Sequence, residues 1–256
     1  MKPSAKWGIL LGMTVATAGV VFVLPAIPQD PNYHHFADSR TIWGISNFWD
    51  VASNLPFFLV ALVGFITLGV QWNEGCFKAG KEMIPYIVFF AGVFLTGWGS
   101  SYYHLTPDNS HLVWDRIPMT IIFMSLVSII LAERTTIAAG FWFLWPLLFT
   151  GIGSVVYWSW TESLGRGDLG PYGFIQFYPS FFIVLVLYLF PKPFPSVKDL
   201  WPLAAFYALA KVFEFLDEPI FQWTGLMSGH ALKHLAAAGS AYWVVVLLQR
   251  RKYLKV

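Results

Sequence analysis

The sequence predicts an all-α membrane protein: a polytopic membrane helix bundle with a seven-helix core and one extra N-terminal span. Two observations lead to this fold class. Of the 256 residues, 57% are hydrophobic and only 12% are charged, whereas a soluble domain carries roughly 25% charged residues. The apolar residues also gather in long runs, and about 20 largely apolar residues are enough for a helix to cross a bilayer.

Eight apolar runs are long enough to be spans. Several contain Gly or Pro, which membrane helices tolerate better than soluble helices do. Short polar segments join the runs, so we expect one compact bundle without a separate soluble domain. The runs cover about 7–27, 50–71, 83–104, 115–132, 137–160, 173–190, 200–217 and 229–249.

The first run has two readings. Lys2 and Lys6 precede it and "LPAIPQD" follows it, which is the charge pattern of a secretory signal peptide. The apolar stretch is long for a signal peptide, and no clear small-residue cleavage site follows it. We therefore favour a retained helix. The chain divides into an N-terminal transmembrane helix, signal-like in its flanks, over 1–28 and a core over 29–256.

The basic residues predict the orientation, because cytoplasmic loops are enriched in Lys and Arg. With eight spans, both termini and most basic loop residues fall on one side, which we expect to be cytoplasmic. The opposite side holds Arg40, Arg116 and Arg166. The cytoplasmic side holds Lys2, Lys6, Lys78, Lys81, Arg134, Lys192, Lys198, Arg250, Arg251, Lys252 and Lys255.

Three histidines are expected near the exterior face. His104 ends the third run, and His230 and His234 lie in "SGHALKHLAAAG", where the last run begins. Residues four apart share one helix face. Three His ligands with an open fourth position form a known catalytic zinc arrangement, and such an ion lowers the pKa of a bound water to about 7. The alternative is a set of polar residues facing a cavity, but intramembrane ionisable groups are costly and usually functional.

Two further residues are expected at the same depth. Asp115 opens the fourth run, and Ser100 precedes His104 by one helical turn, whereas Ser101 points to another face. Asp115 could accept the proton of the zinc-bound water and donate it to a leaving group. Ser100 could donate a hydrogen bond to a developing oxyanion. His111 is a candidate fourth ligand, although we expect it to be a solvated loop residue.

A second polar cluster lies in "ALAKVFEFLDEP". Lys211 and Glu214 are three residues apart, and a Lys within an apolar helix needs a partner. The pair is either a structural ion pair between helices or a polar wall of a substrate cavity that also orients a metal ligand. Lys233 lies between two of the histidines, and we expect it to point to another face or to snorkel to the interface.

These motifs together resemble the alkaline ceramidase family, which belongs to a broader group of seven-helix membrane hydrolases that includes the adiponectin receptors. The motifs are a Ser-x-x-x-His pair, an Asp eleven residues after that His, and a His-x-x-x-His pair opening the last span. "NFWDVASNLPF" at 47–57 and "DRIPM" at 115–119 also resemble family segments, and the resemblance covers about 44–249. It implies a zinc-dependent amidase acting on a sphingoid lipid. The residues carrying these roles would be His104, His230 and His234 on zinc, Asp115 on the proton and Ser100 on the oxyanion.

The chain departs from the family pattern in three places. It has an extra N-terminal span. The eukaryotic ceramidases bind calcium through an acidic stretch and a Glu near the first core helix, but here Asn47 replaces that Glu and the acidic run is missing. Asp38 and Asp50 could form a reduced calcium site, so Ca²⁺ is left open. Arg116 also stands where an acidic residue is common.

The expected function is zinc-dependent hydrolysis of ceramide or a ceramide-like N-acyl lipid, with the substrate reached within the bilayer. One alternative is a receptor or scaffold with a closed, structural zinc site. A transporter would need polar residues that continue through the bundle, and few are present. The direction of the reaction, hydrolysis or amide synthesis, is open. No basic stripe indicates nucleic acid, no protein partner is evident, and the single Cys76 excludes a disulfide framework.

Overall fold

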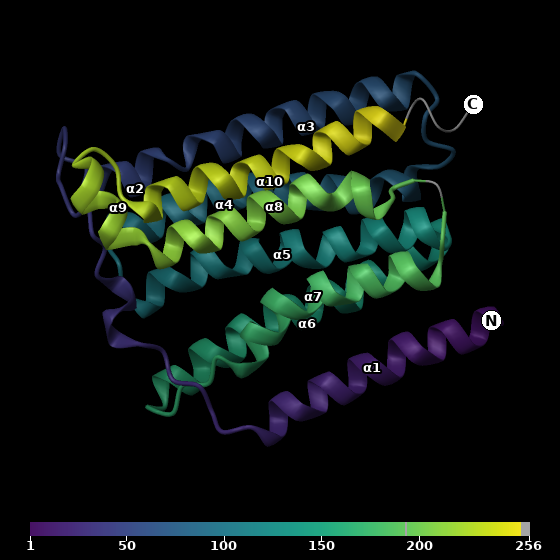
Figure 1. Cartoon of the computed structure of the whole chain (residues 1–256), viewed down its shortest axis with the longest axis horizontal. Helices are drawn as coiled ribbons and strands as arrows, with labels where there is room; N and C mark the ends of the chain where they lie inside the picture. The colour runs from purple at the N-terminus through teal and green to yellow at the C-terminus, as the bar shows by residue number, and fades with distance from the viewer. Residues whose placement is uncertain (193, 252–256) are drawn as a thin grey trace.

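The computed structural model describes residues 1–192 and 194–251, which form a bundle of long helices without a β-strand (Figure 1). The all-α class is therefore confirmed. The helices are α1 (Pro3–Val23), the short 3₁₀ helix η1 (Pro31–His34), α2 (Phe48–Ala52), α3 (Leu55–Asn73), α4 (Gly80–Leu105), α5 (Asn109–Arg134), α6 (Ile137–Ser163), α7 (Gly170–Leu189), α8 (Val197–Phe215), α9 (Asp217–Thr224) and α10 (Gly229–Arg251).

Seven segments among the described residues are long and apolar enough to cross a membrane, with α2 and α3 counted as one. The chain is therefore a polytopic membrane protein. The eighth expected span corresponds to α8, which is not among these seven, because it carries four charged residues: Lys198, Asp199, Lys211 and Glu214. Packing explains how it joins the bundle, since α8 lies along α10 over much of its length (Figure 1).

Two helix boundaries differ from the expected ones for local reasons. α1 ends at Val23, earlier than expected, because Leu24 precedes a proline and takes an extended conformation. α5 begins at Asn109 rather than at 115, because the Asp108 side chain caps it by accepting a hydrogen bond from the His111 N–H at 2.8 Å. Asp115 therefore lies in the second turn of α5.

The N-terminus and the last turn of α10 lie at the same end of the bundle, and α2 and α9 lie at the other end (Figure 1). α1 packs at the periphery against α7. Trp7 stacks on Phe143 with ring centroids 5.7 Å apart, and the Thr14 hydroxyl lies 2.8 Å from that of Tyr178. Lys252 and Lys255, which contribute to the predicted orientation, lie outside the described residues.

A buried ion cluster fixes the C-terminal end of α10. Arg251 is 1% exposed and donates to Glu133 at 2.7 Å, to Glu82, and to the Cys76 carbonyl at 2.6 Å. These partners come from α5, α4 and the α3–α4 loop. The apolar core of α3, α4 and α10 separates this cluster from the opposite end, and its members include Phe57, Phe89 and Val245.

α4 and α5 are in close backbone contact at Gly99. A Cβ atom at this position would lie 2.0 Å from the Trp114 carbonyl oxygen, so only glycine fits. The next residues along the two helices are Ser100 and Asp115. The absence of a side chain at Gly99 thus allows two of the predicted site residues to come together.

We predict that Gly99→Ala lowers the stability of the protein, because the added methyl group must push α5 away. Overpacking of this kind costs about 1–3 kcal/mol. Thermal unfolding of the purified protein in detergent would measure the loss. Gly153→Ala in α6 is the matched control, since a Cβ there meets nothing within 4 Å. Equal unfolding temperatures for the two variants would contradict the prediction.

Candidate metal centre

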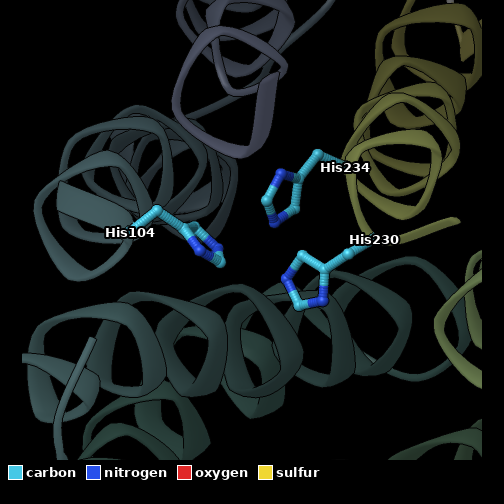
Figure 2. Close-up of side chains that lie close together, drawn as sticks. All are labelled: His104, His230 and His234. Carbon is cyan, nitrogen blue, oxygen red and sulfur yellow. The ribbon is translucent and has the colours of Figure 1, made fainter. Parts of the chain in front are cut away.

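Three buried imidazoles meet at the end of the bundle that holds α2 and α9. His104 comes from the last turn of α4, and His230 and His234 come from the first two turns of α10. One ligand atom from each lies within 4.8 Å of the others, and the rings point toward one another (Figure 2). The predicted convergence of the three histidines is confirmed, and the group could hold a metal ion.

The ring nitrogens fit a metal ion because two of them have no other partner among the described residues. His104 Nδ1 and His230 Nε2 are buried, and no hydrogen bond reaches either atom within that part of the chain. A buried polar atom without a partner costs free energy. Neutral imidazole is a good ligand for Zn²⁺ and for several other transition metals. The site could therefore hold a divalent ion, but three imidazole ligands alone do not determine which metal binds.

His234 is oriented by a serine. The Ser53 hydroxyl donates to the Asp50 carbonyl at 3.2 Å and lies 2.8 Å from His234 Nδ1. Because its hydrogen is used there, the serine oxygen accepts from Nδ1–H, which leaves a lone pair on Nε2. Hydrogen bonds of this type fix the tautomer and the ring orientation of metal-binding histidines.

The first turn of α10 is held in place by its neighbours. Asp217 accepts a hydrogen bond from the His230 N–H at 2.6 Å and one from the Ala37 N–H at 3.0 Å. The Ser228 side chain caps the helix by accepting from Ala231 N–H at 3.1 Å. A Cβ at Gly229 would lie 2.3 Å from the Phe213 carbonyl oxygen, so the helix can approach α8 only with glycine there.

The segment between α1 and α2 closes the outer side of the three histidines. The Phe36 ring lies 4.6 Å from both the His104 and the His230 ring. Asn47, which has a left-handed conformation with φ 47°, donates from its side chain to the His104 carbonyl at 2.8 Å. The segment thus shields the imidazoles and anchors the end of α4.

Ser100 and Asp115 lie beside the histidines. Ser100 is 2% exposed, and its Oγ is 3.5 Å from His234 Nε2. The same hydroxyl is hydrogen-bonded to the carboxyl group of Asp115. Ser101 points away, as expected, and donates to the Gly97 carbonyl at 2.7 Å. The structure therefore brings the predicted proton-transfer and oxyanion residues to the histidine group.

Two other histidines are engaged elsewhere. His111 lies in the first turn of α5 rather than in a solvated loop, and its Nδ1 is 2.8 Å from Asp108. Desolvation alone would raise the pKa of Asp108, but hydrogen bonds from Ser110 and His111 hold it below its ordinary value. His34, at the end of η1, bridges Tyr103 and Asn109 at 2.9 Å each. Neither residue joins the three-histidine group.

The Lys211–Glu214 pair forms as the sequence predicted, with 2.6 Å between Lys211 Nζ and Glu214 Oε2. Lys233 was expected to point to another face or to snorkel to the interface. Its ammonium lies 3.1 Å from Glu214 Oε1, and its side chain lines the cavity beside His234. Because α8 runs alongside α10, Glu214 can reach both lysines, and its two oxygens are shared between them.

A cavity of about 1000 Å³ begins at the histidine group. Ser100, Asp115 and His234 line one end of it, and Leu187 and Val197 line the other, where α7 ends and α8 begins. Apolar side chains make up most of the wall between the two ends. Pockets for organic ligands commonly have volumes of about 300–1000 Å³, so this cavity is large enough for an extended apolar ligand.

The aspartates considered for calcium do not gather with other metal-ligand side chains in the part of the chain that the structure describes. Asp38 is bound by the Arg40 guanidinium at 2.6 Å. Asp50 is buried and accepts from the Ser228 hydroxyl at 3.3 Å. The three histidines are the one group of potential metal ligands found among the described residues. Calcium binding therefore stays untested, and the second carboxyl oxygen of Asp50 has no hydrogen-bond partner within the described residues.

Comparison with known proteins adds no assignment. No model of a known protein family matches the chain, and no curated protein matches it significantly. The resemblance to the alkaline ceramidases therefore stays a prediction.

Several residues around the histidines were not predicted as parts of the site. Ser53 and Asn47 lie within "NFWDVASNLPF", so the motif itself pointed to their region. Asp217 lies in the polar cluster "ALAKVFEFLDEP", so that motif pointed to its region. Phe36 carries no comparable local signal, since its role arises from a contact between distant segments. The partner of Lys233 was not predicted, because Glu214 lies on a different helix.

We predict that His104→Ala and His230→Ala lose bound metal, because each removes one of three ligands. Elemental analysis of the purified proteins would measure this. His35→Ala is the control, since His35 is exposed and outside the group. Full metal occupancy in purified His104→Ala protein would show that the ligand assignment is wrong.

We also predict that Ser53→Ala weakens metal binding about 10- to 100-fold, as loss of a partner of a metal-bound histidine typically does. The measurement is metal affinity by competition with a chelator of known strength. Ser101→Ala provides a matched control, because Ser101 belongs to the same region but bonds only to backbone carbonyls. An unchanged affinity in Ser53→Ala would contradict the role given to this hydroxyl.

Proposed function

We propose that the protein is a zinc-dependent membrane amidase. It would hydrolyse the amide bond of ceramide or a ceramide-like N-acyl lipid to a fatty acid and an amine lipid base. One observation carries the proposal: three buried histidines, a carboxyl group and a serine hydroxyl meet at one end of a long apolar cavity. The resemblance of the sequence to the alkaline ceramidases points to the same reaction.

The proposed metal is zinc, held by His104, His230 and His234. With three histidine ligands and one open position, zinc supplies Lewis acidity and a water-derived nucleophile at neutral pH. The cavity wall reaches this group at His234. A substrate lying in the cavity therefore approaches from the side that faces Ser100 and Asp115.

Asp115 is the residue that moves the proton. Hydrolysis joins a water oxygen to the acyl carbon and breaks the carbon–nitrogen bond, and the departing nitrogen needs a proton. A carboxylate in the cavity wall beside the histidines can accept that proton from water and deliver it to the nitrogen. The hydrogen bond from Ser100 holds the carboxyl group toward the site.

Ser100 is the proposed oxyanion donor. Its hydroxyl lies between the Asp115 carboxyl group and His234, so it is adjacent to any carbonyl that enters the site. A hydroxyl donor of this kind stabilises the charge that develops on the carbonyl oxygen. To do so, it would exchange its bond with Asp115 for one with the substrate, which couples the two residues.

The apolar cavity is the proposed binding site for the hydrocarbon tails. It is lined by side chains such as Phe89, Ile130 and Leu203 along its length. Burial of apolar surface contributes roughly 25 cal/mol per Å², so a lipid tail is favoured over a short polar amide. Since the helices lie in the membrane, the substrate would be taken from the bilayer.

The proposed orientation places the zinc site near the exterior or luminal face, with both termini in the cytoplasm. Its support is the excess of Lys and Arg on the side of the termini. The N-terminus and the last turn of α10 share one end of the bundle, opposite the histidines.

A structural zinc site in a receptor or scaffold would be closed by a fourth protein ligand. The most obvious candidate, His111, is paired with Asp108. No fourth His, Cys, Asp or Glu joins the group within the described ranges. This open arrangement favours the hydrolase over the receptor.

We predict that the purified protein contains near-stoichiometric zinc and releases fatty acid from a labelled short-chain ceramide, and that a chelator abolishes this release. The measurements are elemental analysis and product detection by chromatography. Zinc without hydrolysis across several N-acyl lipids would favour the receptor, and absence of zinc would overturn the metal assignment.

We further predict that Asp115→Asn keeps its zinc but loses turnover, because an amide cannot carry the proton. Loss of a general acid–base residue typically lowers the rate 10²- to 10⁴-fold. Glu218→Gln is the matched carboxyl-to-amide control at the same end of the bundle, since Glu218 is exposed and accepts a hydrogen bond from Gln222 in its own helix. Undiminished turnover in Asp115→Asn would show that another group moves the proton.

A further inference from the structure

The polar end of the cavity contains a cluster in which two lysines share one carboxylate. Lys211 binds Glu214 Oε2 at 2.6 Å, and Lys233 binds Glu214 Oε1 at 3.1 Å. All three residues line the cavity. When each is ionised, the cluster carries one positive charge that no carboxylate within it balances.

Lys233 also has unused hydrogen-bonding capacity. An ammonium group has three N–H donors, and the contact with Glu214 is the one hydrogen bond found for it among the described residues. Its side chain is only 17% exposed, so bulk water solvates it poorly. Donors held in this way in a cavity wall favour a ligand that brings acceptor oxygens.

The other charged residues of the cavity wall do not neutralise this cluster. Asp115 interacts electrostatically with Lys233 as well as with Arg116, which follows it in α5, so its single negative charge is shared between two cations. The Arg116 guanidinium packs 4.2 Å from the Trp158 ring and donates to Gln29 at 2.7 Å. Asp30 is exposed at the rim, and its carboxylate caps η1 by accepting from the Asn32 N–H at 2.9 Å.

The position of the cluster shows which part of a substrate it would meet. The apolar wall runs away from the histidines toward the end of α7 and suits the acyl chain. Lys233 lies one residue before His234, on the neighbouring face of the same turn of α10. A scissile amide at the histidines would therefore have its acyl chain in the apolar part and its amine portion near the lysines.

We propose that, among the N-acyl lipids that this cavity accepts, it prefers those that carry an anionic oxygen group, a carboxylate or a phosphate, on the amine portion, and that Lys233 and Lys211 bind this group. The inference rests on the proposed function, because it takes the histidine group as the place of amide cleavage. Glu214 positions the two ammonium groups and lowers the net positive charge of the cluster. It therefore weakens the preference for an anionic ligand over a neutral one.

The experiment compares ether-linked probes that share a dodecyl chain and contain no amide to cleave. They are dodecyloxyacetate, 2-dodecyloxyethyl phosphate and the neutral 2-dodecyloxyethanol. Binding to the zinc-loaded protein is measured in nanodiscs of neutral lipid, and inorganic phosphate is added as a competitor. We expect at least one anionic probe to bind about 10-fold or more tightly than the neutral probe, as for hydrogen bonds to charged groups, with little competition by free phosphate.

Variants that remove a positive or a negative charge should shift the preference for the anionic probe in opposite directions. A purely structural role of these residues would not produce this pattern. Lys233→Gln and Lys211→Gln should lower the preference for the anionic probe, whereas Glu214→Gln should raise it. Arg166→Gln is the control, since Arg166 is exposed and outside the cavity wall. Because zinc can also attract an anion, dependence on the lysines is the result that identifies them as the binding groups.

The inference is overturned if the neutral probe binds as tightly as both anionic probes, a comparison that needs no variant to fold. It is also overturned if the lysine variants keep the full preference. Anion-selective binding without hydrolysis of N-dodecanoylglycine or N-dodecanoylethanolamine would support the inference and reject the proposed amidase. Hydrolysis of both amides with no anion preference would support the amidase and reject the inference about the lysines.

Discussion

The rest of the structure depends on one constraint. Three imidazoles are buried together inside a membrane protein, and their ring nitrogens need partners. Two of their nitrogens have no partner among the protein atoms of the described residues, and such atoms are expensive where water is excluded. A divalent ion would satisfy them at once. Hydrogen bonds around the group fix the positions of the three rings. Ser53 orients His234, Asn47 bonds the end of α4, and Asp217 bonds the start of α10.

Close helix packing brings Ser100 and Asp115 to the three histidines. Gly99 and Gly229 each stand where a side chain would collide with a neighbouring backbone. The first lets α4 meet α5, which joins Ser100 to Asp115. The second lets α10 approach α8, which brings Glu214 within reach of Lys233. Small residues at helix contacts are a general means of close approach in membranes, and here they also set the geometry of a polar site.

The sequence predicted the helices and the three histidines well, because long apolar runs and one-turn spacings are local signals. His230 and His234 share a face for any helix in that register. The sequence alone could not predict the partner of Lys233. Glu214 lies on another helix, and the pair exists only after α8 and α10 pack. The sequence also could not predict that Phe36 would cover the histidines. Such contacts come from a loop whose path is set by tertiary structure rather than by periodicity.

The charges of α8 have a consequence for how the chain enters the membrane. Lys or Asp at the centre of a helix costs about 2.5–3.5 kcal/mol on insertion scales, and the cost falls toward the helix ends. α8 has Lys198 and Asp199 near its start and Lys211 and Glu214 near its end. The ion pair with Glu214 and the contact with α10 reduce that cost. Stable insertion of α8 is therefore coupled to that of α10, so the last two long helices act as one unit of membrane assembly, and a chain that stops before α10 lacks the partner that α8 needs.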